Sequence, residues 1–405
     1  MTLSDTSPSA PPGFRAADAR PVATVRDPRL DFFRGIAMLI ILIAHVPANW
    51  MNQWIPARFG FSDATEIFVF CSGMASAIAF GQVFRERGWT MGTARVAFRC
   101  WQVYWAHVCL FFAIAATMVV LTASDTLLRD YVGQLNLYPF FNDPATNLVG
   151  LLTLTYVPNY FDILPMYLVV LAMLPAVVAL ARVRVAAAAI AVVTVWILAQ
   201  MDLFALPAEP WSDREWFFNP FGWQLVFFTG FALMAGWLPA PPVDRRLVMF
   251  AATIVVVSVP LAHGPTYREV ALLSEVRGAL VPLIGKSDLG PLRYVHFLAL
   301  AYLAWVAVGP RGARLAPSDS DGPGSRAWRT GLAVILKVGQ QSLAVFIASM
   351  YLARLMGVAL DVTGRTPLNA VLINLAGMAL LVAVAYGAGW FKSAPWRRPA
   401  RSAAP

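Results

Sequence analysis

Long apolar runs separated by short polar segments make up most of the chain. Residues 29–45, RLDFFRGIAMLIILIAH, show the pattern clearly, with charged residues at one end of an apolar run and a histidine at the other. A helix crosses the hydrocarbon core of a bilayer with about 20 mostly apolar residues, so runs of this length predict membrane-spanning helices. Ten such runs predict an all-α, polytopic membrane bundle: residues 32–50, 63–84, 98–122, 160–181, 185–201, 219–238, 246–263, 292–309, 331–356 and 367–391.

Segments outside these runs define the rest of the organisation. Residues 147–157 form a shorter apolar run that ends at Pro158, and we interpret it as a re-entrant or interfacial helix. Residues 1–28 lack the apolar stretch and cleavage site of a signal peptide, so we expect a disordered cytoplasmic tail. Residues 29–391 then form one membrane domain, and residues 392–405 form a basic cytoplasmic tail.

Composition supports a membrane location and indicates the topology. Hydrophobic residues make up 59% of the 405 residues and charged residues only 13%, against about 25% charged residues in soluble domains. An even number of spans places both termini on one face, and Lys and Arg are concentrated there. By the positive-inside rule this face is cytoplasmic. The net charge of +9 then reflects topology and affinity for anionic lipid headgroups, and we expect no nucleic-acid partner.

Several kinds of site are not indicated by the sequence. Cys71, Cys100 and Cys109 lie inside apolar segments and their number is odd, so we expect no disulfide framework. The sequence contains no G-x-x-x-x-G-K-[ST] phosphate loop, no paired cysteines and no H-E-x-x-H motif. We therefore expect neither a metal site nor a tightly bound cofactor.

Ionisable residues of the first run share one face of its helix. His45 follows Arg34 by eleven residues, close to three turns and roughly 16 Å along the axis, and Asp31 lies one turn before Arg34. Charged groups at membrane depth face the bundle interior or a wet cavity, because exposure to lipid is costly. These residues are therefore candidate functional groups. The alternatives are an ion pair and anchors at the membrane edge for Asp31 and Arg34, and a core histidine bonded to a backbone carbonyl for His45.

Glu66 begins the second run, at a depth similar to that of His45, so the two side chains are expected within reach of each other. A carboxylate beside an imidazole raises its basicity and fixes its tautomer, as a general base requires. The alternative is structural, since Asp63-Ala-Thr-Glu66 has the pattern of a capping box. Small residues that favour close helix contact recur every four positions farther along the run, at Gly73, Ala77 and Gly81.

A second group of polar residues lies near the outer ends of later spans. Asp162 precedes the fourth run, while Arg293 and His296 share a face of the eighth run, just after Lys286. His107, in the third run, is a candidate for the lining of the same cavity. The structural alternatives are helix-end anchors for Lys286 and Arg293, and packed histidines for His107 and His296.

Aromatic residues gather near the ends of the spans, where interfacial belts explain most of them. The outer loop EPWSDREWFFNP contains Trp211 and Trp216. An alternative role for these two side chains is to stack on sugar rings. His263, which Gly-Pro follows at a helix end, is expected in a loop.

Several motifs occur together and in order along the chain. The first run carries R-x-D-x-x-R-G-(x)9-H, the second begins with the acidic-led EIFVFCSG, and R-x-x-x-x-Y-W forms the entry to the third. This arrangement resembles the acyltransferase-3 type of integral membrane acyltransferase, and more closely the OpgC family, whose members succinylate osmoregulated periplasmic glucans. The closer resemblance rests on DFFRGIAMLIILIAHVPAN (31–49), FGFSDATEIFVFCSG (59–73), RCWQVYWAH (99–107), NYFDILPMY (159–167), FNPFGWQL (218–225), KSDLGPLRYVHFLALAY (286–302) and VGQQSLAVF (338–346).

The resemblance implies an enzyme of the bacterial inner membrane that moves an acyl group from cytoplasmic acyl-CoA to a hydroxyl of a periplasmic glucan. The closer resemblance, to the OpgC family, implies that this acyl group is succinyl. Arg293 suits the carboxylate of a succinyl donor, because a guanidinium group binds a carboxylate with two hydrogen bonds. The motif and the chemistry together give these candidates: His45 as general base with Glu66, Asp31 and Arg34 for catalysis, and Asp162, Lys286, Arg293, His296 and His107 for substrate binding.

The alternative from another class is a membrane transporter or flippase for a glycan or acyl intermediate, in which the same buried charges would gate a path. Transporters often consist of two related halves. No such repeat is visible in the sequence, and the charges concentrate in the first two runs.

Overall fold

The computed structural model describes residues 27–397 except 126, 128 and 318–321. Helices and connecting loops make up this part of the chain, with an isolated bridge between Pro207 and Glu215, so the all-α prediction is confirmed. Residues 1–26 and 398–405 of the two expected tails lie outside the described residues.

The helices follow one another with short connections. In chain order they are α1 (Pro28–His45), α2 (Ala64–Ser76), α3 (Gln82–Glu86), α4 (Gly88–Thr122), α5 (Tyr131–Gln134), α6 (Tyr138–Asn142), α7 (Pro144–Thr153), α8 (Ile163–Val183), α9 (Val185–Gln200), α10 (Pro220–Met234), α11 (Arg245–Ala262), α12 (Gly264–Glu269), α13 (Ala271–Ile284), α14 (Pro291–Val308), α15 (Pro323–Gln340), α16 (Ser342–Thr363) and α17 (Pro367–Lys392). Three-residue and four-residue 3-10 helices occur at Trp50–Gln53, Pro56–Arg58 and Pro310–Gly312.

Seven helical segments of the described chain are long and apolar enough to cross a membrane. They are α4, α8, α11, α14, α16, α17 and the continuous segment Ala64–Glu86, in which the π-helical Ala77–Gly81 joins α2 to α3. The helices α9 and α10 are apolar but shorter. The helix α1 is not among the seven, and its first two turns carry Arg29, Asp31 and Arg34. A total of ten spans with both termini in the cytoplasm stays a prediction.

The predicted span 331–356 is wrong as a single helix. The chain leaves the helical conformation at Gln341 (φ −104°, ψ 28°), so α15 ends and α16 begins within the apolar run. The helix α15 is amphipathic, with Arg326, Arg329 and Lys337 among its residues, and it packs along α1. Hydropathy alone missed the break because both sides of it are apolar. The short helix predicted within 147–157 is present as α7, which ends at the left-handed Leu154 (φ 60°).

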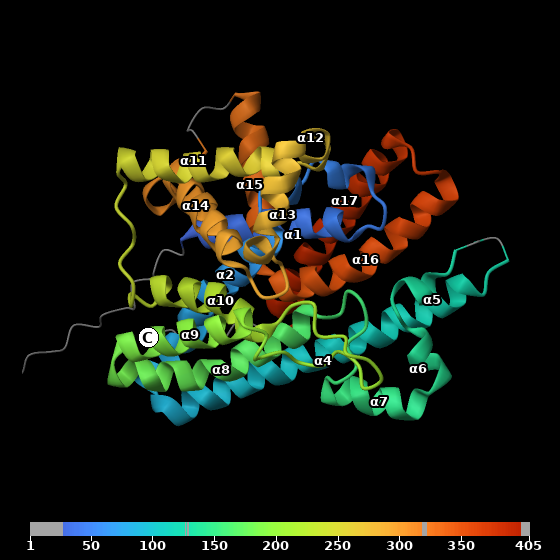
Figure 1. Ribbon diagram of the computed structural model, residues 1–405, viewed down its shortest axis with the longest axis horizontal. Helices are drawn as coiled ribbons and strands as arrows, with labels where there is room; N and C mark the ends of the chain where they lie inside the picture. Colours follow the sequence, from blue (N-terminus) through green and yellow to red (C-terminus); the bar gives the residue numbers. More distant parts are fainter. Residues whose placement is uncertain (1–26, 126, 128, 318–321, 398–405) are drawn as a thin grey trace, which may run out of the picture.

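The helices α1 and α2 form the centre of the bundle (Figure 1). They pack against each other, and α1 also contacts α15 and α16, while α2 contacts α10 and α14. The helices α4, α8, α9 and α10 lie side by side below this pair in the figure, and α11 and α14 lie above it. The short helices α5 to α7 gather at one end of the molecule (Figure 1). The two motif-bearing helices are therefore surrounded by the rest of the fold.

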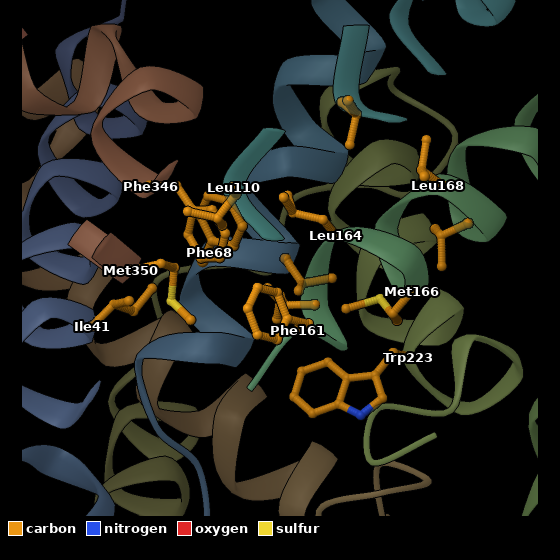
Figure 2. Close-up of a cluster of buried hydrophobic side chains, with 14 of the residues drawn as sticks. Ile41, Phe68, Leu110, Phe161, Leu164, Met166, Leu168, Trp223, Phe346 and Met350 are labelled. Atoms are coloured by element: carbon orange, nitrogen blue, oxygen red, sulfur yellow. The ribbon is translucent and has the colours of Figure 1, made fainter. Parts of the chain in front are cut away.

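A hydrophobic cluster fills the space where α1, α2, α4, α8 and α16 meet (Figure 2). The rings of Phe68 and Phe346 stack with centroids 5.5 Å apart, and Ile41, Leu110 and Met350 lie beside them. Full burial of such side chains stabilises the fold by about 1.5–3 kcal/mol each. This packing holds the ends of α1 and α2 in a fixed relative position.

Close contact between α2 and α10 depends on two glycines. A Cβ atom at Gly73 would collide with the Phe227 carbonyl oxygen, and one at Gly230 would collide with that of Phe70. The predicted small-residue face is thus confirmed at Gly73. It does not extend to Gly81, whose added Cβ would meet only the Arg85 side chain at 3.6 Å.

We expect Gly73→Ala to destabilise the protein, because the clash is with backbone atoms that cannot rotate away. Overpacking of this kind costs about 1–3 kcal/mol. Thermal unfolding of the purified protein in detergent should show a lower midpoint for this variant. Gly387→Ala in α17 is the control, since a Cβ atom there meets nothing within 4 Å. Equal midpoints for the two variants would contradict the close α2–α10 contact.

Candidate functional site

A cavity of about 440 Å³ lies where α1 ends and where α2 and α8 begin. Its floor includes Ile41 and Phe346 of the hydrophobic cluster. Its polar lining comes from five segments of the chain that are separate in sequence, and it includes His45, Asp63, Thr65, Asn159, Tyr160, Asp162, Arg214 and Lys286. The cavity therefore collects His45, Asp162 and Lys286 from the sequence-predicted residues.

His45 is the last residue of α1 and lines this cavity. Its Nδ1 lies 2.8 Å from the carbonyl oxygen of Ile41. A carbonyl only accepts hydrogen bonds, so Nδ1 carries the proton and the neutral ring keeps a lone pair on Nε2. His45 is thus bonded to a backbone carbonyl, as the structural alternative expected. The same position also leaves its Nε2 able to act as a base toward the cavity.

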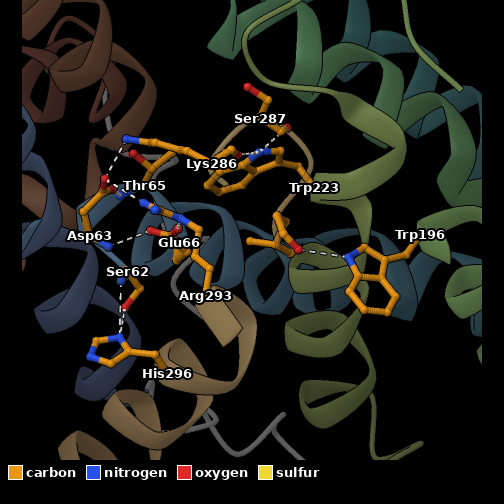
Figure 3. Close-up of polar contacts among 11 residues, drawn as sticks. Ser62, Asp63, Thr65, Glu66, Trp196, Trp223, Lys286, Ser287, Arg293 and His296 are labelled. Atoms are coloured by element: carbon orange, nitrogen blue, oxygen red, sulfur yellow. Dashed lines mark hydrogen bonds and ion pairs between the residues drawn. The ribbon is translucent and has the colours of Figure 1, made fainter. Parts of the chain in front are cut away.

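Four charged side chains form a network beside the cavity (Figure 3). Lys286 Nζ lies 2.6 Å from Asp63 Oδ2, and Arg293 Nη2 lies 3.2 Å from the same oxygen. Arg293 Nε donates to Glu66 Oε1. Burial alone would raise the pKa of Asp63, but Lys286 and Arg293 outweigh it and hold the pKa of this carboxyl below its usual range. Asp63 is therefore a stable anion between two cations.

Glu66 contributes to this network and not to His45. Besides Arg293, its carboxylate accepts the Asp63 backbone N–H at 2.7 Å, which completes the predicted capping box. Glu66 is fully buried (0% exposed), so both oxygens require such partners. The expected contact between Glu66 and His45 is replaced by these bonds, and Glu66 orients Arg293 and the start of α2.

The loop that carries Lys286 is fixed by indole and amide groups of α9 and α10 (Figure 3). Trp223 Nε1 donates to the carbonyls of Lys286 and Ser287 at 2.9 and 3.1 Å. Trp196 Nε1 donates to the Leu289 carbonyl at 3.0 Å. Because the backbone of this loop is held at several points, the Lys286 ammonium has a defined position at the cavity.

The remaining predicted histidines lie away from the cavity lining. His296 Nδ1 lies 2.8 Å from Ser62 Oγ and accepts the Ser62 backbone N–H at 3.3 Å, so this ring holds the segment before α2 against α14 (Figure 3). His107 is fully buried beside Phe161, and neither of its ring nitrogens has a hydrogen-bond partner in the described part of the chain. Their geometry matches the packed-histidine alternative. His263 lies between α11 and α12, as expected for a loop residue.

Asp162 occupies the N-cap position of α8, where its side chain makes no capping hydrogen bond and instead lines the cavity. Its Oδ1 accepts the Phe217 backbone N–H at 3.0 Å. Burial raises the pKa of Asp162 to about 6, although the Phe217 N–H and the charge of Arg214 act in the opposite direction. The carboxyl group anchors the loop that follows Trp216.

The two tryptophans of the loop before α10 differ in exposure. Trp216 is only 4% exposed and donates its indole N–H to the Pro207 carbonyl, so its rings are not available to a sugar. Trp211 is 47% exposed, with Tyr156 beside it at a centroid distance of 5.7 Å.

A separate pocket of about 200 Å³ lies near the start of α1. Three arginines line it, Arg34, Arg95 and Arg99, together with Ser72, Ser76, Gln102 and the π-helical turn of Ala79 and Phe80. Arg34 Nη2 donates to Ser342 Oγ, and Asp31 is buried nearby in α1. Asp31 and Arg34 are therefore not brought to His45; they belong to the opposite end of the same helix.

Several residues of the two sites were not predicted from the sequence. Arg99 begins the motif R-x-x-x-x-Y-W, but neither Arg95 nor Arg99 was among the predicted site residues, although their i, i+4 spacing on one helix is a signal for a shared face. Arg214 and Tyr160 come from loops, where no periodicity indicates direction. In the part of the chain that the structure describes, no three His, Cys, Asp or Glu side chains are arranged to hold a metal ion.

We expect Arg293→Met to destabilise the protein by about 3–5 kcal/mol, the cost of leaving one partner of a buried ion pair alone. Glu66 would lose the guanidinium partner of its carboxyl group in a fully buried position. Thermal unfolding in detergent measures the effect, with Arg268→Met in the exposed part of α12 as control. The double variant Glu66→Gln/Arg293→Met should recover much of the loss. No difference between Arg293→Met and the control would show that the pair carries no such constraint.

Comparison with known protein families gives one match over nearly the whole described chain. A family model described as OpgC protein matches residues 26–393. No curated protein and no solved structure matches the chain. The matched range covers both the His45 cavity and the arginine-lined pocket.

Proposed function

Because the chain belongs to the OpgC protein family, we propose that it is a multi-pass inner-membrane O-acyltransferase that moves a succinyl group from cytoplasmic acyl-CoA to a hydroxyl of a periplasmic glucan. The observation that carries the proposal is the position of His45. Its Nδ1 is bonded to the Ile41 carbonyl while its ring lines a cavity large enough for a sugar unit. A neutral imidazole oriented in this way is a general base.

In the proposed reaction His45 Nε2 removes the proton of a glucan hydroxyl as its oxygen attacks the thioester carbonyl carbon of the donor. The carbon–sulfur bond breaks, the ester forms, and the proton passes from His45 to the CoA thiolate. The neighbouring ion network contributes by fixing the start of α2 and the Lys286 loop around the reacting atoms. Asp162 holds the outer loop against the cavity in the same way.

We propose that the arginine-lined pocket binds the phosphates of the donor. Arg34, Arg95 and Arg99 provide three guanidinium groups, which suit phosphate oxygens better than ammonium groups do because of their planar donor geometry. Eleven residues of α1 separate Arg34 from His45, or roughly 16 Å, which an extended pantetheine arm is long enough to cross. The positive-inside rule puts this pocket at the cytoplasmic side and the His45 cavity at the periplasmic side.

The succinyl assignment needs a cation for the free carboxylate of the acyl group. Arg293 was the expected residue, but its Nε and Nη2 already donate to Glu66 and Asp63. Lys286 lines the cavity directly, with its side chain 29% exposed, and shares Asp63 with Arg293. Lys286 is therefore our candidate for binding the acyl carboxylate, because Asp63 keeps one cation when Lys286 turns to the donor.

For the base assignment we expect His45→Gln to lower acyl transfer by roughly 10²–10⁴-fold, the usual contribution of a general base. The variant should insert and purify like the wild type. The measurement is mass spectrometry of periplasmic glucans from cells that express each variant. His263→Gln, in the loop between α11 and α12, is the control and should leave transfer intact. Full glucan acylation by His45→Gln would refute the role of the base.

For the acyl carboxylate we expect Lys286→Met to lower kcat/KM for succinyl-CoA by about 10–100-fold, the range of a lost hydrogen bond to a charged group. Transfer from acetyl-CoA should change little, because an acetyl group has no carboxylate. Lys286→Arg keeps the charge and serves as control. The two donors should compete in the same assay with purified protein. Equal losses for both donors would limit Lys286 to a structural role, and a wild-type preference for acetyl-CoA would remove the succinyl assignment.

A further inference from the structure

Tyr160 stands at the opening of the His45 cavity and has no part in the chemistry described above. It lines the cavity and is 50% exposed; among the other aromatic residues of the lining, Phe217 is similarly exposed at 49% and Phe346 is buried. Its ring centroid lies 6.2 Å from that of His45, in an edge-to-face arrangement. A large part of the ring is thus open next to the proposed base.

The backbone of Tyr160 has an unusual conformation. Its φ of 72° lies in the left-handed region, which a bulky side chain without special support seldom adopts. Asn159 and Tyr160 form the turn that precedes α8, where a glycine would meet the same geometry without strain. Strain of this kind persists where the surrounding structure holds the residue in place, and it is frequent at ligand sites.

Arg354 of α16 holds the ring of Tyr160 in place. Its guanidinium carbon lies 4.4 Å from the Tyr160 ring centroid, and its Nη2 donates to the His45 carbonyl at 2.8 Å. Arg354 itself is buried, at 5% exposed, so this cation is enclosed between the two residues. The same side chain therefore sets the position of the end of α1 and of the Tyr160 ring. The distance between the base and the ring is fixed by one group.

The geometry points to Tyr160 as the platform on which a glucose unit of the acceptor stacks, with a sugar hydroxyl directed at His45. The C–H groups on the face of a pyranose ring carry partial positive charge and pack on the negative face of an aromatic ring. A rigid ring beside the base places such a unit at low entropic cost. This inference rests on the proposed function for the identity of the acceptor, but the binding of the glucan is measurable without the reaction.

The test is glucan binding by purified full-length protein that also carries His45→Ala, so that no transfer occurs. The probe is unsubstituted periplasmic glucan from a strain that lacks the gene, and affinity is measured by isothermal titration calorimetry. Tyr160→Gly removes the ring, and glycine adopts the left-handed backbone of this position without strain. This variant is therefore expected to fold, so that a loss of binding reports on the ring itself. We expect it to weaken glucan binding by about tenfold, equivalent to ~1.4 kcal/mol. Tyr160→Phe keeps the ring and should bind as the parent does.

Trp211→Ala is the matched control, because this outer-loop side chain has a similar exposure, 47% against 50%. Equal glucan affinity with and without the Tyr160 ring overturns the inference, and so does a loss in Trp211→Ala alone. Steady-state kinetics of the same substitutions with His45 intact should show a raised KM for glucan and an unchanged KM for the acyl-CoA. A merely structural role would change both constants. If wild-type protein binds glucan through Tyr160 but transfers no acyl group, the proposed function fails and the platform stands.

Discussion

The buried ion pair between Glu66 and Arg293 is the constraint on which the site depends. Glu66 is fully buried, and an unpaired carboxylate at such a position is too costly to tolerate, so α14 must deliver Arg293 to the first turn of α2. The same carboxylate caps α2 through the Asp63 N–H. Replacing a buried ion pair by apolar residues is often neutral for stability. Its importance here is therefore geometric, since it permits one relative position of α2 and α14.

The position of the cavity follows from that arrangement. Asp63 lies between Arg293 and Lys286, so the anion that begins α2 also attracts the loop before α14. The indole groups of Trp223 and Trp196 fix the same loop from the opposite side. An ammonium group is thus held near the end of α1 by elements that are distant in sequence. The cavity forms where the end of α1, the start of α2 and the Lys286 loop come together. Its floor is part of the hydrophobic cluster in which Phe68 and Phe346 stack.

Sequence alone predicted the features that depend on local pattern. The all-α class, the capping box at Asp63 and Glu66, and the close contact at Gly73 each follow from spacing within one helix. The break at Gln341 was missed because apolar residues flank it on both sides, in the last turns of α15 and along α16. The partners of Glu66 and Arg293 were also missed, because pairing between α2 and α14 is a property of packing. Depth along a helix predicts which residues are level with each other, but not which of them touch.

Hydrogen bonds near each end of the shared length connect α1 to α16. Arg34 donates to Ser342 at the start of α16, and Arg354 donates to the carbonyl of His45 at the end of α1. The two helices run in the same direction, and the bonded residues are eleven apart on α1 and twelve apart on α16. Sliding one helix along the other would break both bonds at once. The two helices therefore keep a fixed position along each other. The separation between the arginine-lined pocket and His45 is set by the helical rise of α1 and not by the conformation of any loop.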